Sequence, residues 1–351
     1  MMASYCSAEQ ADFSLAQEAA ANGNYREVVA ILSRVLNDPE ILPEQTVVAL
    51  ANRGIAYSLL KAYALARQDL EDALEINPQH PLSLNHLGLL LEQVNEDYEA
   101  AASLYQKAIE QQFPASQVNL ANLYWYGKGL KRNSKRAFEL YRAAAEAGYK
   151  MAFVPLGEIY ATGDGAPQDS KRAFELFLSA SKTGVPAASY HMGFAYEKGR
   201  GVRQNLALAK RNYQIAAIQG HGEAQNALGY LYRRGLGVEQ NFVEAATWYQ
   251  LAADQGVAGA MNRLAWLLAG CPDPDVCNGE NAVKLANAAI ESGETAYRLD
   301  SLAAGYARLG MFDEASDVMG RVLKLVPVDS RKHQEFERRQ NRYLQGIMMQ
   351  L

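Results

Sequence analysis

The chain has 351 residues, a formal net charge of -5, 49% hydrophobic residues and 21% charged residues. This composition excludes a disordered chain, and the acidic balance argues against nucleic acid as the main partner. No apolar run reaches the roughly 18–20 residues that a membrane-spanning helix needs, so we expect no transmembrane segment.

Residues 9–112 are expected to form three helix pairs. The middle pair is the clearest, with small and apolar residues at the spacing of a 34-residue helix-pair repeat: Gly54, Tyr57, Ala66, Leu70, Ala73 and Pro78. A weaker unit precedes it around Gly23-Asn24-Tyr25. Another follows at Leu87-Gly88 and has one extra residue in its loop. These units resemble tetratricopeptide repeats.

Residues 115–257 contain one pattern four times, at a spacing of 36 residues without insertion or deletion. Two of its columns are Tyr124, Tyr160, Tyr196 and Tyr232, and Gly127, Gly163, Gly199 and Gly235. A period of this length is typical of a solenoid, in which each unit buries its apolar face only against its neighbours.

Each of these repeats is predicted to be an antiparallel helix pair. In the second one, the segment 162–167 contains two glycines and a proline, which end the first helix. Asp169 is a suitable N-cap for the second helix, and Gly184 is a suitable left-handed C-cap. Gly157 sits on the apolar face of the first helix, where a missing side chain lets the partner helix approach closely.

The pattern A-x3-LG-x2-Y-x2-G-x-G-x3-[DN]-x3-A-x3-[YF]-x2-A-x3-G resembles the Sel1-like repeat, a relative of the tetratricopeptide repeat with a longer, glycine-containing internal loop. Two departures are Ser116 in place of the first Ala and Ala121 in place of the Gly of the LG pair. The resemblance implies an all-α, right-handed α-solenoid whose concave surface binds other proteins.

The C-terminal part continues the stack. Residues 258–327 are expected to form two more tetratricopeptide-like pairs, the first with a long loop at 271–279, and residues 328–351 a capping helix. Phe336, Tyr343, Leu344, Ile347 and Met348 would cover the end of the stack. Arg338, Arg339 and Arg342 would face water.

The resemblance also implies which side chains line the groove. In such units the first helix faces it, through positions one and four residues after the LG glycine column and three before it. The predicted groove residues are Asn122, Trp125, Tyr126, Glu158, Tyr190, Phe194, Glu197, Asn226, Tyr230, Arg233, Asn262 and Trp266. Aromatic rings mixed with Arg and amides suit recognition of a peptide or a partner helix. Alternatively, some of these rings pack between repeats.

The sequence offers few residues for chemistry. Ser179-Ala180-Ser181-Lys182 and Lys182-Thr183-Gly184 match two short motifs of penicillin-recognising enzymes, but they share one lysine and overlap the glycine of the repeat. The histidines lack metal-ligand spacing, so we predict no catalytic residue, metal or cofactor. Cys271 and Cys277 are close enough in sequence to form a disulfide in an oxidising compartment, and two free thiols are the other alternative.

We therefore predict a non-catalytic interaction scaffold with a protein or peptide partner and without nucleic acid. A carbohydrate-binding envelope protein is one alternative, because aromatic grooves also stack on sugars. A hydrolase of the cysteine-rich Sel1-like kind is another, although this chain has only 3 Cys. The N-terminus shows no signal peptide, which predicts a cytoplasmic location as the chain stands. A signal peptide upstream of the given start would place it in the periplasm or envelope.

Overall fold

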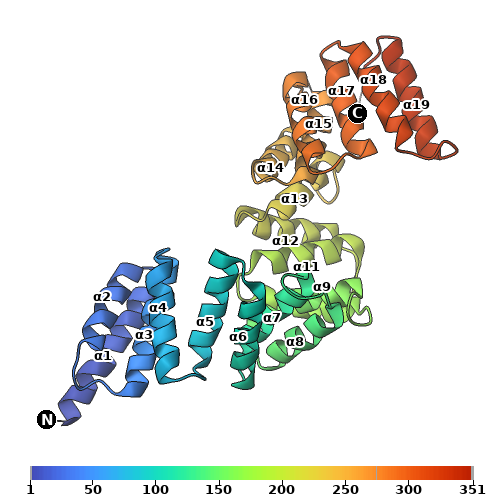
Figure 1. Cartoon of the computed structure of the whole chain (residues 1–351). Coiled ribbons are helices and arrows are strands. Elements are labelled where there is room, and N and C mark those ends of the chain that lie inside the picture. The colour runs from blue at the N-terminus through green and yellow to red at the C-terminus, as the bar shows by residue number, and fades with distance from the viewer. Residues whose placement is uncertain (1, 274, 349–351) are drawn as a thin grey trace. The chain divides into compact units, whose positions relative to one another are not determined.

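The computed structural model describes residues 2–273 and 275–348, and side chains from residue 11 onward. Within these residues every regular element is helical, and successive helices pack as antiparallel pairs (Figure 1). The all-α solenoid fold predicted from the repeat columns is confirmed. The chain divides into two compact units, unit 1 at 1–169 and unit 2 at 170–351.

Unit 1 contains the elements coloured blue to green in Figure 1. They are α1 (Met2–Ala21), α2 (Tyr25–Leu36), α3 (Pro43–Leu59), α4 (Tyr63–Ile76), α5 (Pro81–Leu90), η1 (Leu91–Asn95), α6 (Tyr98–Glu110), α7 (Pro114–Tyr126), α8 (Ser134–Glu146), η2 (Lys150–Ala152) and α9 (Phe153–Thr162). The extra residue noted after Leu87-Gly88 is absorbed by η1, a π-helical turn. Such turns commonly accommodate a single inserted residue.

The described residues of unit 2 form ten helices. They are α10 (Ser170–Ser181), α11 (Pro186–Lys198), α12 (Leu206–Ile218), α13 (Gly222–Arg234), α14 (Phe242–Asp254), α15 (Ala258–Gly270), α16 (Gly279–Glu291), α17 (Ala296–Arg308), α18 (Phe312–Lys324) and α19 (Arg331–Leu344). Within the segment 328–351, where a capping helix is expected, α19 occupies Arg331–Leu344, and residues 349–351 lie outside the described residues. Its N-cap Ser330 accepts a hydrogen bond from the His333 amide at 3.1 Å.

Polar caps and glycines set the period of the repeats. Asn205 and Asn241 cap α12 and α14, and their side chains accept hydrogen bonds from Leu208 N and Glu244 N at 3.0 and 2.9 Å. Gly201 has a φ of 71°, and a Cβ there would lie 2.0 Å from the Ser170 carbonyl oxygen. Only glycine permits both this backbone conformation and this close approach.

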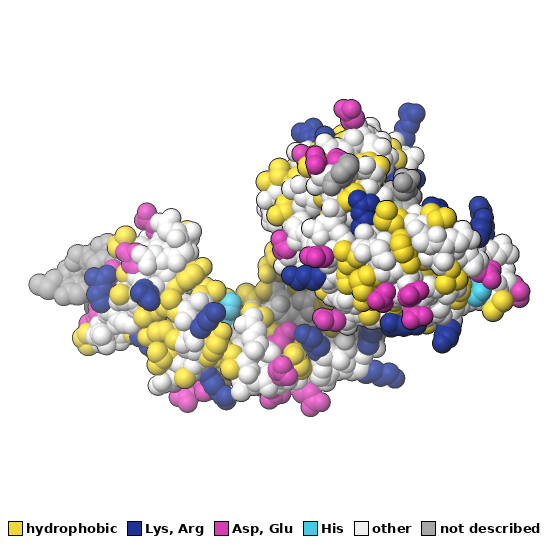
Figure 2. All heavy atoms as spheres, turned by 90° about the horizontal axis from the view of Figure 1, so that it is seen from above, with side chains coloured by type: hydrophobic (Ala, Val, Ile, Leu, Met, Phe, Trp, Pro, Cys, Tyr) yellow, Lys and Arg dark blue, Asp and Glu magenta, His cyan; other side chains and the backbone are white. Residues whose placement is uncertain are grey.

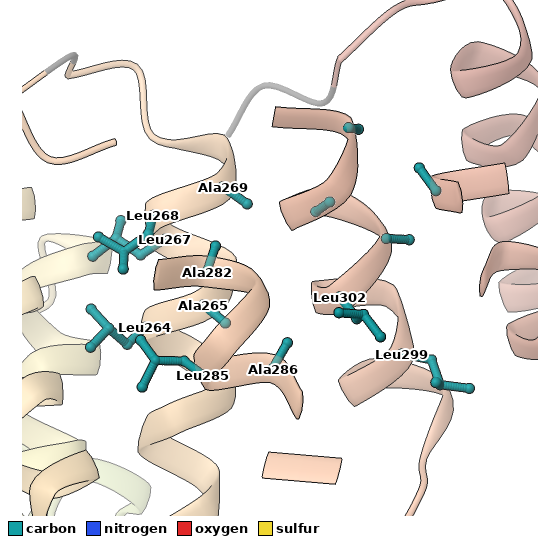
Figure 3. Packing of buried hydrophobic residues seen from close by; sticks show 14 of the residues in the cluster. Leu264, Ala265, Leu267, Leu268, Ala269, Ala282, Leu285, Ala286, Leu299 and Leu302 are labelled. Carbon is teal, nitrogen blue, oxygen red and sulfur yellow. The ribbon is translucent and has the colours of Figure 1, made fainter. Parts of the chain in front are cut away.

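The core is a row of small and branched side chains between neighbouring pairs. One buried cluster joins three helices (Figure 3). It includes Leu264, Ala265 and Leu268 of α15, Ala282, Leu285 and Ala286 of α16, and Leu299 and Leu302 of α17. Alanines at the contact points allow close approach of the helices, and the leucines fill the remaining space.

Candidate functional site

In unit 2, the first helix of a pair packs against an aromatic ring from the second helix of the same pair. Tyr213 of α12 and Tyr249 of α14 are both 0% exposed. A Cβ on Gly193 would lie 2.6 Å from Tyr213, and one on Gly229 would lie 2.7 Å from Tyr249. The glycine column therefore exists because each ring crosses the first helix at this point. We call the surface made by α11, α13, α15, α17 and α19 the first-helix face of unit 2.

The tyrosine hydroxyl holds a carboxylate of this face in place. The Tyr213 hydroxyl donates to Glu197 Oε2 at 2.7 Å, and Lys198 Nζ lies 2.5 Å from Glu197 Oε1. Burial, together with the neighbouring Glu197, raises the pKa of Tyr213, so the hydroxyl remains a donor across the neutral range. Glu197 is only 8% exposed and is fixed by both contacts.

One cleft on this face lies over α11 and α13 and has a volume of about 330 Å³. Five predicted groove residues line it: Tyr190, Phe194, Glu197, Asn226 and Tyr230. The ring of Tyr190 stacks on His221 with centroids 4.9 Å apart. Two positive side chains, Lys198 and Arg263, and two negative ones, Glu197 and Glu223, line this cleft. Arg263 forms no ion pair with either carboxylate and also lines the cleft described next.

A second cleft, of about 290 Å³, lies over α15, α17 and α19. Three predicted groove residues line it: Arg233, Asn262 and Trp266. The other lining residues were not predicted: Arg263, Tyr297, Asp300, Ser301, Lys332, Glu335, Phe336 and Arg339. Positively charged side chains outnumber negatively charged ones here, with four Arg and Lys against Asp300 and Glu335. We call it the cationic cleft.

The capping helix contributes to this cleft through Arg339. Its guanidinium forms ion pairs with Asp300 and with Glu335, and it lies 4.8 Å from the centre of the Trp266 ring. The prediction that Arg339 faces water is wrong, because its side chain is only 15% exposed. A buried partner on α17 draws it inward, and Arg338 and Arg342 remain exposed.

The capping helix covers the end of the stack with fewer residues than expected. Phe336 and Tyr343 are buried, as predicted. Leu344, Ile347 and Met348 are exposed, so that part of the prediction is wrong. The helix ends at Leu344 and the chain turns at Gly346, which has a φ of 70°. Ile347 and Met348 therefore lie beyond the helix, and Leu344, its last residue, is 65% exposed.

Asp300 is the most unusual group of the cleft. It is 3% exposed, and burial raises its pKa to about 6, although the Arg339 guanidinium opposes the shift. Its Oδ1 and the Oδ1 of Asn262 are buried without a hydrogen-bond partner among the described residues. A buried acceptor without a donor costs free energy, so both atoms would gain from a ligand that supplies N–H or O–H groups. The sequence signal was an aspartate between leucines, in Leu299-Asp300-Ser301-Leu302.

The remaining predicted groove residues lie in unit 1 and line neither of these clefts. Asn122 accepts a hydrogen bond from the Tyr141 hydroxyl at 2.6 Å, so it serves as a packing contact between α7 and α8. Arg132 lies 5.6 Å from the centre of the Trp125 ring. Tyr126 is 67% exposed at the end of α7, and Glu158 is partly exposed on α9.

An apolar cleft that sequence reasoning did not predict lies in unit 1, among α1, α2 and α3. It measures about 350 Å³ and is lined mainly by apolar side chains, including Phe13, Tyr25, Val28 and Leu59. No column of the 36-residue repeat passes through it, because it lies in the N-terminal helix pair, which is the weakest match to a repeat pattern. Its lining contains no charged residue that would select a ligand.

Cys271 and Cys277 are free thiols in the structure. Cys277 Sγ donates to the Cys271 and Asp273 carbonyl oxygens at 2.8 and 3.1 Å, so it is directed at the backbone of the loop. Burial raises the pKa of the Cys271 thiol. The second alternative from the sequence, two thiols, describes this structure. The described residues contain no cluster of three or more His, Cys, Asp or Glu that could hold a metal, and no helix long and apolar enough to cross a membrane.

The family model for the Sel1 repeat matches five segments, at residues 81–113, 114–149, 156–184, 186–221 and 222–257. This chain is a Sel1 repeat protein. The matched segments include the four 36-residue repeats and also residues 81–113, which precede them. Sel1 repeat proteins generally act as protein-interaction scaffolds, and the family is generally non-catalytic.

Solved structures of other Sel1 repeat proteins are similar to this one. A Sel1 repeat protein from Oxalobacter formigenes has 29% sequence identity and a TM-score of 0.63, covering 68% of this chain and 96% of its own. The protein c5321, a protective antigen of uropathogenic Escherichia coli strains, has 23% identity and a TM-score of 0.64, covering 95% of this chain and 76% of its own. This second similarity concerns the fold alone.

Proposed function

We propose that this Sel1 repeat protein is a non-catalytic scaffold that binds a peptide segment of a partner protein along the first-helix face of unit 2. The main observation in support is that two clefts on this face share Arg263 in their linings. Together they present aromatic rings, amides and charged groups from the five helices α11, α13, α15, α17 and α19. An extended peptide would contact both clefts.

The rings are suited to this role because they are already held in place. Tyr190 stacks on His221, and Tyr230 lies 5.9 Å from both the Arg233 and the Arg263 guanidinium carbon. A side chain that is fixed before binding loses little conformational entropy when a ligand arrives. A buried aromatic anchor typically contributes about 2 kcal/mol or more to binding.

The two alternatives have less support. A cysteine-rich hydrolase would need a regular pair of cysteines in each repeat, and this chain has 3 Cys in all. A neutral sugar would stack on Trp266 or Tyr230 but carries no charge to neutralise the excess of cations in the cationic cleft. A peptide can satisfy rings, amides and charges together.

Selection of short random peptides on the full-length chain tests the proposal. We expect enrichment of specific sequences, and loss of about 30-fold or more in their affinity when Trp266 is changed to Ala, which corresponds to the ~2 kcal/mol of an anchor. Trp125→Ala is the matched control in unit 1 and should change the affinity less than threefold. Absence of any enriched peptide, together with binding of oligosaccharides, would contradict the proposal.

A further inference from the structure

The cationic cleft is positive although the protein as a whole is acidic. The chain carries a net charge of -5. On the face drawn in Figure 2, acidic and basic side chains are interspersed. In the cleft, however, Arg233, Arg263, Lys332 and Arg339 stand against Asp300 and Glu335. The excess of positive charge is therefore a local property of this cleft.

The two acidic groups do not neutralise three of these four cations. Asp300 and Glu335 both pair with Arg339, and no described residue forms a salt bridge with Arg233, Arg263 or Lys332. Cations that have no ion-pair partner and surround a partly enclosed space create a positive potential. This potential is stronger near low-dielectric walls than on an open surface. The cleft therefore favours a negatively charged ligand.

Aromatic rings hold these cations in fixed positions. Arg233 and Arg263 approach the Tyr230 ring, and Lys332 Nζ lies 4.7 Å from the centre of the Tyr297 ring. In addition, Arg263 Nη1 donates to Asn226 Oδ1 at 2.6 Å. These contacts leave further N–H groups of each guanidinium available, because a guanidinium has five. Trp266 and Phe336 add apolar surface beside them.

The cleft also contains groups that match a peptide backbone. Asn262 Oδ1 lacks a donor. A peptide N–H can supply one, and the amide NH₂ of the same side chain can donate to a peptide carbonyl. An anion that has only acceptor oxygens, such as sulfate, would satisfy the cations but would leave Asn262 Oδ1 without a donor.

We propose that the cationic cleft binds an acidic peptide segment. Its Asp, Glu or C-terminal carboxylates contact Arg233, Arg263 and Lys332, its backbone pairs with Asn262, and an apolar side chain packs on Trp266. This inference rests on the proposed function and adds the chemical class of the partner. It excludes basic peptides, which the three free cations would repel.

Peptide selection on two charge variants of the full-length chain tests the assignment. The first variant combines Arg233→Gln with Lys332→Gln. The second, the matched control, combines Arg211→Gln with Lys324→Gln, which removes the same charge from exposed positions outside the cleft. Circular dichroism melts of both variants confirm that each is folded. Isothermal titration then measures the selected peptides, their Asp→Asn and Glu→Gln versions, and a single-stranded oligonucleotide of random sequence.

We expect acidic residues to be enriched among peptides selected on the natural chain and on the control variant. The cleft variant should lower their affinity at least about tenfold, and so should the amide versions of the peptides. Enriched peptides without acidic residues would overturn this inference but leave the proposed function standing, whereas no enriched peptide at all would overturn both. Acidic enrichment that persists on the cleft variant, or tighter binding of the oligonucleotide, would also overturn the inference.

Discussion

Each unit contains a tryptophan on its first-helix face, covered by an arginine that pairs with an aspartate. In unit 1, Arg132 lies 5.6 Å from the Trp125 ring and 2.5 Å from Asp164, and the side chains of the ion pair are 57% and 43% exposed. In unit 2, Arg339 lies 4.8 Å from the Trp266 ring and pairs with Asp300, and those side chains are 15% and 5% exposed. The Arg–Asp pair is thus exposed to water in one unit and buried in the other, whereas both tryptophans are partly buried.

Burial reverses the electrostatic outcome. Hydrogen bonds from Ser134 and Arg132 lower the pKa of the exposed Asp164. Burial raises the pKa of Asp300 to about 6, although Arg339 pairs with it. An arginine beside an exposed aspartate therefore stabilises the ionised carboxylate. An arginine beside a buried aspartate only partly compensates for the hydration that the carboxylate has lost. In unit 2, Trp266, Arg339 and Asp300 therefore attach α19 to the neighbouring helices and also line a cleft.

The largest predicted effect is a difference in stability between variants of Arg339 and Arg132. Arg339→Ala leaves Asp300 buried without its ion-pair partner and removes one of the contacts between α19 and the helices α15 and α17. We expect a loss of about 3 kcal/mol in the free energy of unfolding, as for other buried pairs that lose one member. Arg132→Ala removes an exposed pair and should cause no resolvable change. Urea denaturation of both variants measures this, and equal losses would show that burial does not distinguish the two ion pairs.

A second prediction concerns a feature that the units share. A Cβ on Gly88 in unit 1 would lie 2.6 Å from Tyr105, and one on Gly229 in unit 2 would lie 2.7 Å from Tyr249. We expect Gly88→Ala and Gly229→Ala each to lower the free energy of unfolding by about 1–3 kcal/mol through overpacking. The matched control is Gly320→Ala in α18, where a Cβ would meet only Gln340 at 3.7 Å.

The control substitution should change the free energy of unfolding in the opposite direction. Alanine has a higher helix propensity than glycine, so Gly320→Ala should stabilise the chain by roughly 0.5–1 kcal/mol. Thermal melts of the three variants rank them directly. If Gly229→Ala is as stable as the natural chain, the position of the Tyr249 ring does not require a glycine at residue 229.

The smallest predicted effect is a difference in pH dependence. The pKa of Asp300 is about 6 in the folded chain, against about 3.9 for an unfolded aspartate. Its protonation therefore favours folding: that stability is fully present below the unfolded pKa and is lost as the pH rises through 6. Between pH 7 and pH 5 the natural chain should gain about 1 kcal/mol relative to Asp300→Asn.

Asp164→Asn should show no such trend in the same window, because the folded pKa of Asp164 is lowered and its titration falls below pH 5. Urea denaturation of the natural chain and both variants at pH 5, 6 and 7 makes the comparison. A difference between the natural chain and Asp300→Asn that does not vary with pH would place Asp300 in a more hydrated setting than the structure gives it.

The sequence was informative wherever a column repeats. The 36-residue spacing predicted the helix pairs and the close packing at the glycine column. It also predicted an N-cap at Asp169, and Asn205 and Asn241 cap their helices at the same position of the next two repeats. It also identified eight residues that line the two clefts of unit 2, from Tyr190 to Trp266. Their binding role stays a prediction.

Arg339 and Asp300 were missed because neither belongs to a repeat column. Their side chains meet through the docking of α19 on the stack, which a periodic pattern does not specify. Arg339 also follows the surface pattern of a charged helix, as its neighbour Arg338 does. Only the buried aspartate between two leucines hinted at a partner.

The most direct test of the account follows the two tryptophans during binding. In a Trp125→Phe, Trp248→Phe variant the remaining tryptophan is Trp266, and in a Trp248→Phe, Trp266→Phe variant it is Trp125. Titration with a selected acidic peptide should shift and saturate the fluorescence of Trp266 at the concentration set by the calorimetric Kd, and leave that of Trp125 unchanged. A saturating change at Trp125 with a silent Trp266 would contradict the assignment of binding to unit 2.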